Sequence, residues 1–174
     1  MPILVLRHGQ SEWNAVRRWQ GSADSPLTPL GREQAATTAR LLALGRPWSG
    51  VWTSDLKRAS ETAAIIADEL GLGEPIADPR LREADAGEWE GLTADEIELR
   101  WPGWLEDHRR PASFESYVAV VARARAALLD VAVMAASEAP QVALVVAHSG
   151  VVRSLIRELG GDDRRRLPNL GGVW

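Results

Sequence analysis

Short apolar runs alternate with longer segments of helical period along the whole sequence. The apolar runs are residues 3–6, 51–53, 75–77 and 142–147. They lack the apolar–polar alternation of a half-exposed strand, which is typical of parallel strands covered on both faces. Because helix-length segments separate these runs, the pattern predicts an α/β fold. We expect a three-layer sandwich with a mostly parallel central sheet flanked by helices.

Capping residues and glycines delimit the predicted helices. Thr28 and Pro29 open the first long helix, which ends at Gly45. Ser54 or Asp55 is expected to cap the second helix. The remaining predicted helices follow the capping box at residues 93–96 and cover residues 114–136 and 151–159.

A length of 174 residues supports one domain, which we expect to span residues 1–174. The helical stretch at about residues 92–136 is expected to form an insert or lid. The apolar face predicted for its long helix passes through Val118, Val121, Leu128, Ala132 and Val133.

Composition narrows the classes of protein. The chain has no cysteine, which excludes disulfide frameworks, thiolate nucleophiles and iron–sulfur clusters. Its 20 basic and 24 acidic side chains give a net charge of −4, unlike a general nucleic-acid binder. No apolar run reaches the ~20 residues of a membrane span, and Arg7 interrupts the first run too early for a signal peptide. We expect a cytoplasmic protein with neither a nucleic acid nor a membrane as partner, and a solvated loop at the basic residues 164–166.

Histidine and arginine gather at the predicted strand ends. Arg7 and His8 follow the first strand, and His148 follows the most apolar one. Arg58 lies one helical turn beyond the second strand. Because ligands of an open parallel sheet bind beyond the carboxyl ends of its strands, these side chains are expected to share one site. Arginine forks and helix N-termini both suit phosphoryl oxygens, so the sequence predicts a phosphate pocket, without a Walker motif.

A metal site is the alternative for the same residues. The two histidines and Glu83 would form a two-histidine, one-carboxylate ligand set. Because Arg7 and Arg58 would repel a cation, we favour the phosphate pocket. His108 has no comparable context and is expected to be a surface residue.

Five groups of motifs occur in order along the chain: RHGQSEWN at 7–14, QG with DSPLT at 20–28, SDLKRA at 54–59, LRE with WEG at 81–91, and VVAHSG at 145–150. Together they resemble the histidine phosphatase superfamily, the phosphoglycerate-mutase-like proteins. The resemblance covers most of the chain, and it is specific because all the motifs are present in the expected order. It implies the phosphoglycerate-mutase-like α/β fold and points to the phosphatase branch.

The resemblance implies a covalent mechanism. His8 would be the nucleophile and would form a phosphohistidine. Arg7, Arg58 and His148 would surround the phosphoryl group, with His148 at least partly protonated when a dianion is bound. Glu83 would protonate the leaving oxygen and then activate the water that cleaves the phosphoenzyme.

A substrate-binding set is implied as well. Asn14, Gln20, Gly21 and Ser149 would contact the phosphate or the rest of the substrate. The resemblance implies no metal and no cofactor, and the expected partner is a small phosphorylated substrate; a homodimer is left open. The candidates for contacts to the leaving group are Trp101, Trp104, Arg109, Arg110 and Phe114.

The superfamily contains phosphatases and mutases, which its motifs barely separate. Mutases typically carry a longer insertion between the acid and the second histidine, whereas Glu83 and His148 are 65 positions apart here. We therefore predict a metal-independent phosphomonoesterase. A cofactor-dependent phosphoglycerate-type phosphomutase and a non-catalytic phosphoester-binding module are the alternatives.

Two departures from the pattern of the superfamily stand out. Residues 113–116 read SFES where many relatives have Gly-Glu-Ser, and Phe114 is expected to reshape the substrate end of the pocket. Asn169 resembles a landmark that a strand usually follows, but only residues 170–174 come after it.

Overall fold

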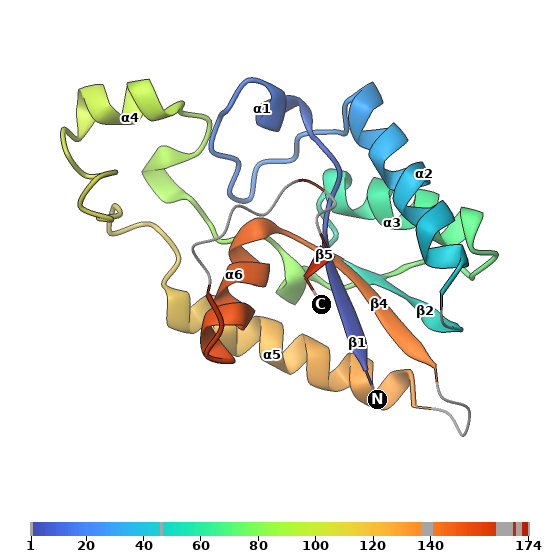
Figure 1. The fold of residues 1–174 in the computed structure, drawn as a ribbon. Helices are drawn as coiled ribbons and strands as arrows, with labels where there is room; N and C mark the ends of the chain where they lie inside the picture. The colour runs from blue at the N-terminus through green and yellow to red at the C-terminus, as the bar shows by residue number, and fades with distance from the viewer. Residues whose placement is uncertain (1, 46, 137–140, 163–168, 170–171, 174) are drawn as a thin grey trace.

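A five-stranded sheet in the order β3-β2-β4-β1-β5 forms the centre of the molecule (Figure 1). The computed structural model describes residues 2–45, 47–136, 141–162, 169 and 172–173. The strands are β1 (Ile3–Arg7), β2 (Trp48–Thr53), β3 (Ile76–Ala77), β4 (Val142–Ala147) and β5 (Gly172–Val173). The helices are α1 (Glu12–Ala15), α2 (Pro29–Ala43), α3 (Lys57–Glu69), α4 (Ala94–Arg100), α5 (Tyr117–Met134) and α6 (Ser149–Glu158), with the short 3-10 helices η1 (Pro79–Leu81) and η2 (Gly87–Trp89).

The pairing of the strands is mostly parallel. Both β1 and β2 pair in parallel with β4, and β3 pairs in parallel with β2. The short β5 lies antiparallel beside β1. Arg7 lies opposite Ala147 and Thr53 opposite Val146, so β1, β2 and β4 end at the same edge of the sheet. The predicted α/β class is thereby confirmed, and the residues that follow these three strands come side by side.

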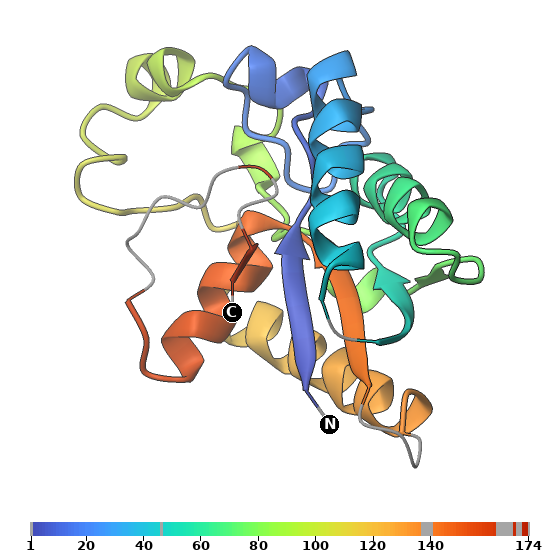
Figure 2. The same ribbon diagram turned by 45° about the vertical axis from the view of Figure 1, so that its right-hand side comes forward.

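Helices cover both faces of the sheet, which makes the fold the predicted three-layer sandwich (Figure 1, Figure 2). On one face, Ala63 of α3 packs in a cluster with Leu144 and Val146 of β4. On the other face, Val120 of α5 packs in a cluster with Val145. Alternate residues of β4 therefore face opposite layers, and all of them are buried.

The face that the long helix α5 turns to the sheet agrees only in part with the one predicted. Val121 is buried and Leu128 packs partly buried against the core, as expected. Val118 and Val133, which were expected inside, are 72% and 76% exposed. The helix carries apolar side chains on nearly all sides, so its pattern does not select one face. Its buried residues are Val120, Val121, Ala124, Ala127 and Val131.

The start of α3 also differs from the prediction. The helix begins at Lys57, with Leu56 at its N-cap and no side-chain cap. Of the predicted caps, Ser54 accepts a hydrogen bond from the backbone of Leu56, and Asp55 pairs with Arg82. Neither residue caps the helix, because Ser54 binds the backbone of Leu56 ahead of the first turn and Asp55 is taken by the distant Arg82.

The stretch predicted as an insert consists of two different parts. α4 lies to one side of the sheet (Figure 1), in contact with an aromatic cluster where Trp89 and Ile97 are fully buried. The predicted capping box of Thr93 and Glu96 opens α4. α5, in contrast, is a layer of the sandwich. The basic run 164–166 lies outside the described residues, and none of the described helices is long and apolar enough to cross a membrane.

Candidate active site

The ends of β1, β2 and β4 bring histidines and arginines together at one edge of the sheet. The backbone N–H of His8 donates to the carbonyl of Ala147, the last residue of β4, at 3.0 Å. His148 follows β4, and the ring centroids of the two histidines are 5.1 Å apart. Arg58 reaches this edge from the first turn of α3. The exposed fraction is 2% for His8 and 0% for His148 and Arg58.

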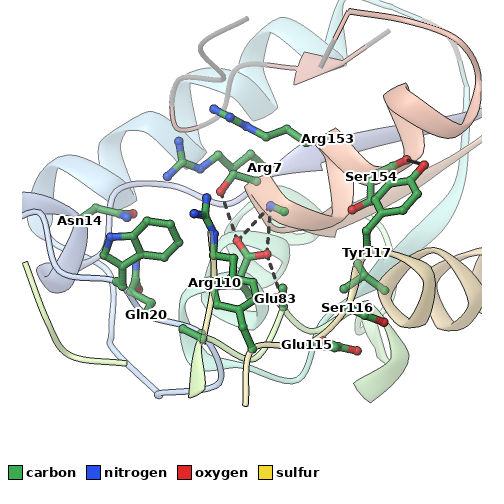
Figure 3. A pocket seen from close by; sticks show the side chains of 18 of the residues that line it. Arg7, Asn14, Gln20, Glu83, Arg110, Glu115, Ser116, Tyr117, Arg153 and Ser154 are labelled. Carbon is green, nitrogen blue, oxygen red and sulfur yellow. Dashed lines mark hydrogen bonds between the residues drawn. The ribbon is translucent and has the colours of Figure 1, made fainter. Parts of the chain in front are cut away.

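A cavity of about 750 Å³ opens at this edge (Figure 3). His148 is fully buried and does not line it, although its ring adjoins that of His8. We call Arg7, His8, Arg58 and the adjoining His148 the floor of the cavity. The other predicted catalytic and substrate-binding residues all line it, namely Glu83, Asn14, Gln20, Gly21 and Ser149.

The imidazole of His8 is held in one tautomer. Its Nδ1 lies 2.6 Å from the carbonyl oxygen of Gly9, which can only accept a hydrogen bond. Nδ1 therefore carries the proton, and Nε2 is left with its lone pair. Burial lowers the pKa of His8 well below its ordinary value, and the charges of Arg58 and Arg7 act in the same direction. The ring is thus neutral near pH 7.

His148 is a buried imidazole with unsatisfied nitrogens. Neither its Nδ1 nor its Nε2 has a hydrogen-bond partner among the described residues. Burial, Arg58 and His8 lower its pKa well below the ordinary value. Buried polar groups are normally satisfied, so a missing partner on a ring that adjoins the cavity lining points to a ligand. A bound anion would supply that partner and would raise the pKa of the ring.

Arg58 ties the floor to the loop that follows α1. Its Nη1 donates to the carbonyl of Ala23 at 2.6 Å and its Nη2 to that of Gly21 at 2.9 Å. Burial lowers the pKa of this guanidinium, but an arginine remains charged. Gly21 has φ +50°, and a Cβ there would lie 2.6 Å from the backbone nitrogen of Ala86. Only glycine fits here, because any side chain at residue 21 would clash with the backbone of Ala86.

Glu83 binds the N-terminus of α6 (Figure 3). Its two carboxylate oxygens accept from the backbone N–H of Gly150 at 3.0 and 3.1 Å. The hydroxyl of Ser149 donates to the same carboxylate at 3.2 Å, and the backbone of Ala84 donates at 2.9 Å. An acidic group at a helix N-terminus is stabilised by the free N–H groups and the helix dipole. The arrangement places a carboxylate directly beside the floor.

The amide side chains of Gln20 and Asn14, which line the cavity, also hydrogen-bond to neighbouring protein groups. Gln20 accepts a hydrogen bond from the hydroxyl of Ser11 at 2.8 Å. Asn14 accepts from the side chain of Asn169 at 2.9 Å, and the same Asn169 amide donates to the carbonyl of His8 at 3.3 Å. Asn169 was noted in the sequence only as a landmark. Its contacts show that it ties the C-terminal part of the chain to the floor.

Arginine is the most frequent charged residue in the cavity lining. Several of these arginines were not among the site residues predicted from the sequence. Seven arginines line the cavity against two glutamates, although the net charge of the chain is −4. Gly150, Arg153, Ser154 and Arg157 follow at helical spacing along one face of α6, a signal that is visible in the sequence. We call the part of the cavity away from the floor the outer wall, which consists of Arg110, Phe114, Tyr117, Arg153 and Arg157.

Two of the five candidates for leaving-group contacts lie on the outer wall. Arg110 stacks over Phe114 with its guanidinium carbon 5.6 Å from the ring centroid, and burial lowers its pKa. Trp101, Trp104 and Arg109 do not line the cavity. Arg109 lies 4.4 Å over the ring of Trp104, and the two indoles are 6.2 Å apart. These three residues pack the segment around α4.

The described residues contain no group of three or more histidine, aspartate or glutamate side chains that could hold a metal ion. Arg7 and Arg58 lie beside the imidazoles and lower their pKa, which reflects the positive potential there. That potential suits an anion. His108, predicted as a surface residue, is exposed and lies on the rim of the cavity.

Two buried imidazoles, one arginine from a strand end, one from the first turn of α3 and a carboxylate at a helix N-terminus define a site for phosphoryl-group chemistry. Residues 3–172 match the model of the histidine phosphatase superfamily (branch 1). The chain therefore belongs to this superfamily, as the order of its motifs predicted.

Known relatives include phosphatases and mutases. A glucosyl-3-phosphoglycerate phosphatase of Mycolicibacterium vanbaalenii is 38% identical over an alignment of 183 positions. The alignment covers 98% of this chain and 79% of the relative. A probable phosphoglycerate mutase of Enterobacter sp. (strain 638) is 38% identical over an alignment of 180 positions. That alignment covers 96% of this chain and 80% of the relative. The structure of the mycobacterial glucosyl-3-phosphoglycerate phosphatase with VO3 has a TM-score of 0.80 and 34% identity, covering 90% of this chain and 79% of that one.

Proposed function

We propose that this protein is a metal-independent phosphomonoesterase that forms a phosphohistidine on His8. The state of the His8 ring carries the proposal. Its Nδ1 is engaged at 2.6 Å, its Nε2 holds the lone pair, and its pKa is lowered. A neutral nucleophile is therefore available near pH 7, beside Arg7 and Arg58. The substrate is a small phosphorylated metabolite.

In the first half-reaction, Nε2 of His8 attacks phosphorus and the bond from phosphorus to the leaving oxygen breaks. Arg7 and Arg58 stabilise the charge on the equatorial oxygens. His148 donates to the same group once the bound dianion raises its pKa. Glu83, in its protonated form, gives its proton to the leaving oxygen, so the alcohol departs neutral.

In the second half-reaction, water attacks the phosphohistidine. The bond between phosphorus and Nε2 of His8 breaks, and the carboxylate of Glu83 takes the proton of the water. Inorganic phosphate is released, and Glu83 is again protonated for the next cycle. The covalent intermediate divides one difficult transfer into two easier ones.

Phosphatase activity is better supported than mutase activity. Glucosyl-3-phosphoglycerate phosphatases resemble the chain both in sequence and in fold. A mutase must shield its phosphohistidine from water and return the phosphoryl group to a second position. The separation of 65 positions between Glu83 and His148 leaves little room for the additional cover that mutases carry.

The outer wall favours a phosphate ester that carries a second acidic group. Arg153 lies on this wall, and its Nε is buried with no hydrogen-bond partner among the described residues. A carboxylate would satisfy such a guanidinium with charge-assisted hydrogen bonds. The names of the relatives point the same way, because a phosphoglycerate carries a carboxylate beside its phosphate.

We also propose that residues 1–174 form one domain, in which residues 93–116 are the insert that covers the cavity. Arg110 and Phe114 of this segment lie on the outer wall, which supports the assignment. α5 belongs to the sheet layers instead.

The experiment that tests the proposal is phosphate release from p-nitrophenyl phosphate in excess EDTA, with His8→Ala in parallel. We expect metal-free turnover in the wild type and a loss of more than about 10³-fold in the variant. Arg125→Gln, an exposed substitution on α5, is the control and should retain activity. Turnover that requires added metal, or a His8→Ala variant as active as the wild type, would refute the proposal. Phosphoryl exchange between positions of a phosphoglycerate without release would establish the mutase instead.

A further inference from the structure

The loop that carries Glu83 lies between the short helices η1 and η2 and belongs to no strand. Its position decides where the carboxylate meets the leaving oxygen. We infer that Arg123 and Glu115 are positioning residues that hold this loop and so aim Glu83 at the leaving group. The inference rests on the proposed function, in which Glu83 is the general acid.

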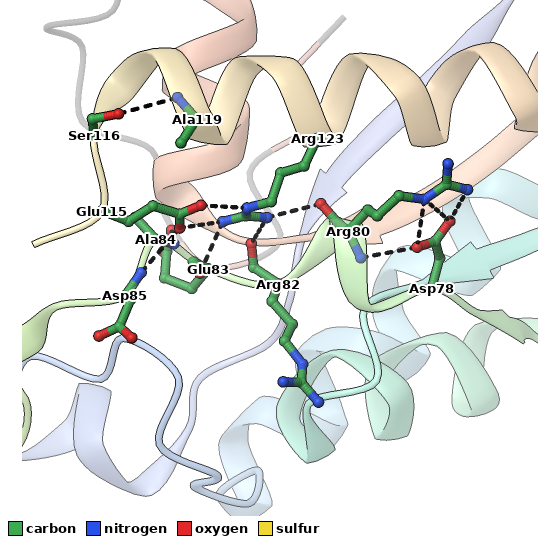
Figure 4. Close-up of polar contacts among 10 residues, drawn as sticks. All are labelled: Asp78, Arg80, Arg82, Glu83, Ala84, Asp85, Glu115, Ser116, Ala119 and Arg123. Atoms are coloured by element: carbon green, nitrogen blue, oxygen red, sulfur yellow. Dashed lines mark hydrogen bonds and ion pairs between the residues drawn. The ribbon is translucent and has the colours of Figure 1, made fainter.

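All five donors of the Arg123 guanidinium are engaged (Figure 4). Nη1 donates to the carbonyls of Arg80 at 2.8 Å and Arg82 at 2.6 Å, and Nη2 to that of Glu83 at 3.1 Å. Nε and Nη2 donate to the two carboxylate oxygens of Glu115, each at 2.7 Å. A guanidinium presents its donors in one rigid plane, so a single side chain of α5 fixes one carbonyl of η1 and two of the loop that follows it.

Glu115 holds the loop on the other side of the acid. Its carboxylate accepts from the backbone N–H of Asp85 at 3.2 Å, and its own N–H donates to the carbonyl of Asp85 at 2.9 Å. Arg123 and Glu115 together therefore hydrogen-bond to the backbone on both sides of Glu83. Burial acts to raise the pKa of Glu115, but the hydrogen bonds and charge of Arg123 outweigh it, so the pKa lies below its ordinary value. The ion pair is intact at neutral pH.

This assignment explains what residues 113–116 do, where SFES stands in place of Gly-Glu-Ser. Ser116 is the N-cap of α5, and its hydroxyl accepts from the backbone of Ala119 at 3.2 Å. Glu115 precedes it and binds Arg123 two turns into the helix. Arg123 itself does not line the cavity, so it acts on the reaction through the backbone of Glu83. The motif thus links the start of α5 to the acid.

The expected signature is a dependence on the leaving group. A displaced acid transfers its proton poorly, and a displacement of about 1 Å can cost on the order of 10²-fold in rate. Phenolate needs that proton more than p-nitrophenolate does, because it is the more basic leaving group. A purely structural defect would instead reduce both reactions equally.

The test compares kcat/KM for phenyl phosphate and p-nitrophenyl phosphate, two esters that differ chiefly in the leaving group. This ratio reports the first half-reaction alone, in which Glu83 acts as the acid. For Arg123→Gln we expect a loss of about 10–100-fold with phenyl phosphate and less than about 3-fold with p-nitrophenyl phosphate. In a Glu83→Gln background the same substitution should cause no further loss, since both act on one proton transfer. Arg125→Gln, two residues along the same helix and exposed, is the matched control and should change neither rate.

Two milder variants cover the case in which Arg123→Gln does not fold. Arg123→Lys keeps the charge but not the fork, and Glu115→Gln keeps the shape but not the charge. Both should show the same leaving-group dependence, with smaller losses. Equal losses on both esters, or losses that multiply with those of Glu83→Gln, would overturn the positioning role. An inactive wild type would instead count against the proposed function.

Discussion

The floor and the outer wall of the cavity are built in opposite ways. The floor lies at strand ends whose positions are set by the backbone pairing of β1, β2 and β4. The outer wall consists of side chains that rest on other side chains. Arg110 lies 4.9 Å over the ring of Trp89, and Arg157 lies 4.5 Å over that of Tyr117. The floor is therefore rigid by topology, whereas the wall depends on local packing.

This difference separates chemistry from selectivity. The groups that would handle the phosphoryl transfer are buried and fixed by the sheet. The groups that would meet the rest of the substrate are carried by α6 and by the segment around α4. A substitution in the floor should therefore impair every substrate, and one in the wall should impair some substrates only. The predictions below test that division.

Among the predictions that test this division, the largest effect is expected at Gly150, where the acid meets the floor. A Cβ there would lie 2.2 Å from Oε1 of Glu83. The carboxylate is the end of a flexible side chain and can move aside, so Gly150→Ala should fold normally. Alanine even favours a helix over glycine by about 0.5–1 kcal/mol. Displacing the acid should lower kcat/KM for phenyl phosphate by about 10²-fold, measured beside p-nitrophenyl phosphate.

Gly73→Ala is the matched control for Gly150→Ala. A Cβ at Gly73 would have no neighbour within 4 Å, so this variant should keep wild-type kcat/KM on both esters. If Gly150→Ala kept full activity on phenyl phosphate, the contact between Glu83 and α6 would have no part in catalysis.

Much of this division could be predicted from the sequence. Apolar runs and the residues that follow them predicted the strands, and strand ends predicted which side chains meet. His8 and His148 were thus placed correctly beside each other. Backbone pairing is read directly from such patterns, because parallel strands share one edge for their carboxyl ends.

The side-chain contacts around the cavity could not be predicted in the same way. Arg123 looks like any charged residue on a helix until the carbonyls that it binds are known. α5 is apolar nearly all round, so its inward face could not be chosen from its period. Trp101 and Trp104 were candidates for substrate contacts, but they pack around α4 because aromatic clusters form between segments distant in sequence. Such contacts depend on the tertiary structure.

A smaller effect is expected in the outer wall, at Arg153. Arg153→Gln should raise KM for 3-phosphoglycerate by about 10-fold, since charge-assisted hydrogen bonds contribute about 1.5–3 kcal/mol and the wall is partly open to water. Glycerol phosphate, which has no carboxylate, should show less than about 2-fold change. The measurement is the ratio of KM values for the two esters. An equal change for both esters would show that Arg153 binds the phosphoryl group, as the floor does, and would contradict the division between floor and outer wall.

The last prediction concerns stability, and it tests the buried histidines of the floor. Burial and arginines lower the pKa of His8 and His148 well below 6.5 in the folded protein. In the unfolded chain both titrate near 6.5. Below that pH the unfolded state binds protons that the folded state does not, so the free energy of unfolding falls as the pH falls. The slope should approach about 1.4 kcal/mol per pH unit for each histidine.

Urea unfolding between about pH 5 and 6.5 measures this slope, because ordinary carboxylates titrate mainly below that range. His148→Gln should remove about half of the slope, since one of the two buried imidazoles is gone. Saturating inorganic phosphate should flatten the wild-type slope, because a bound dianion favours protonated His148 in the folded state. A slope that His148→Gln left unchanged would show that the floor is not the neutral, buried pair that the mechanism requires.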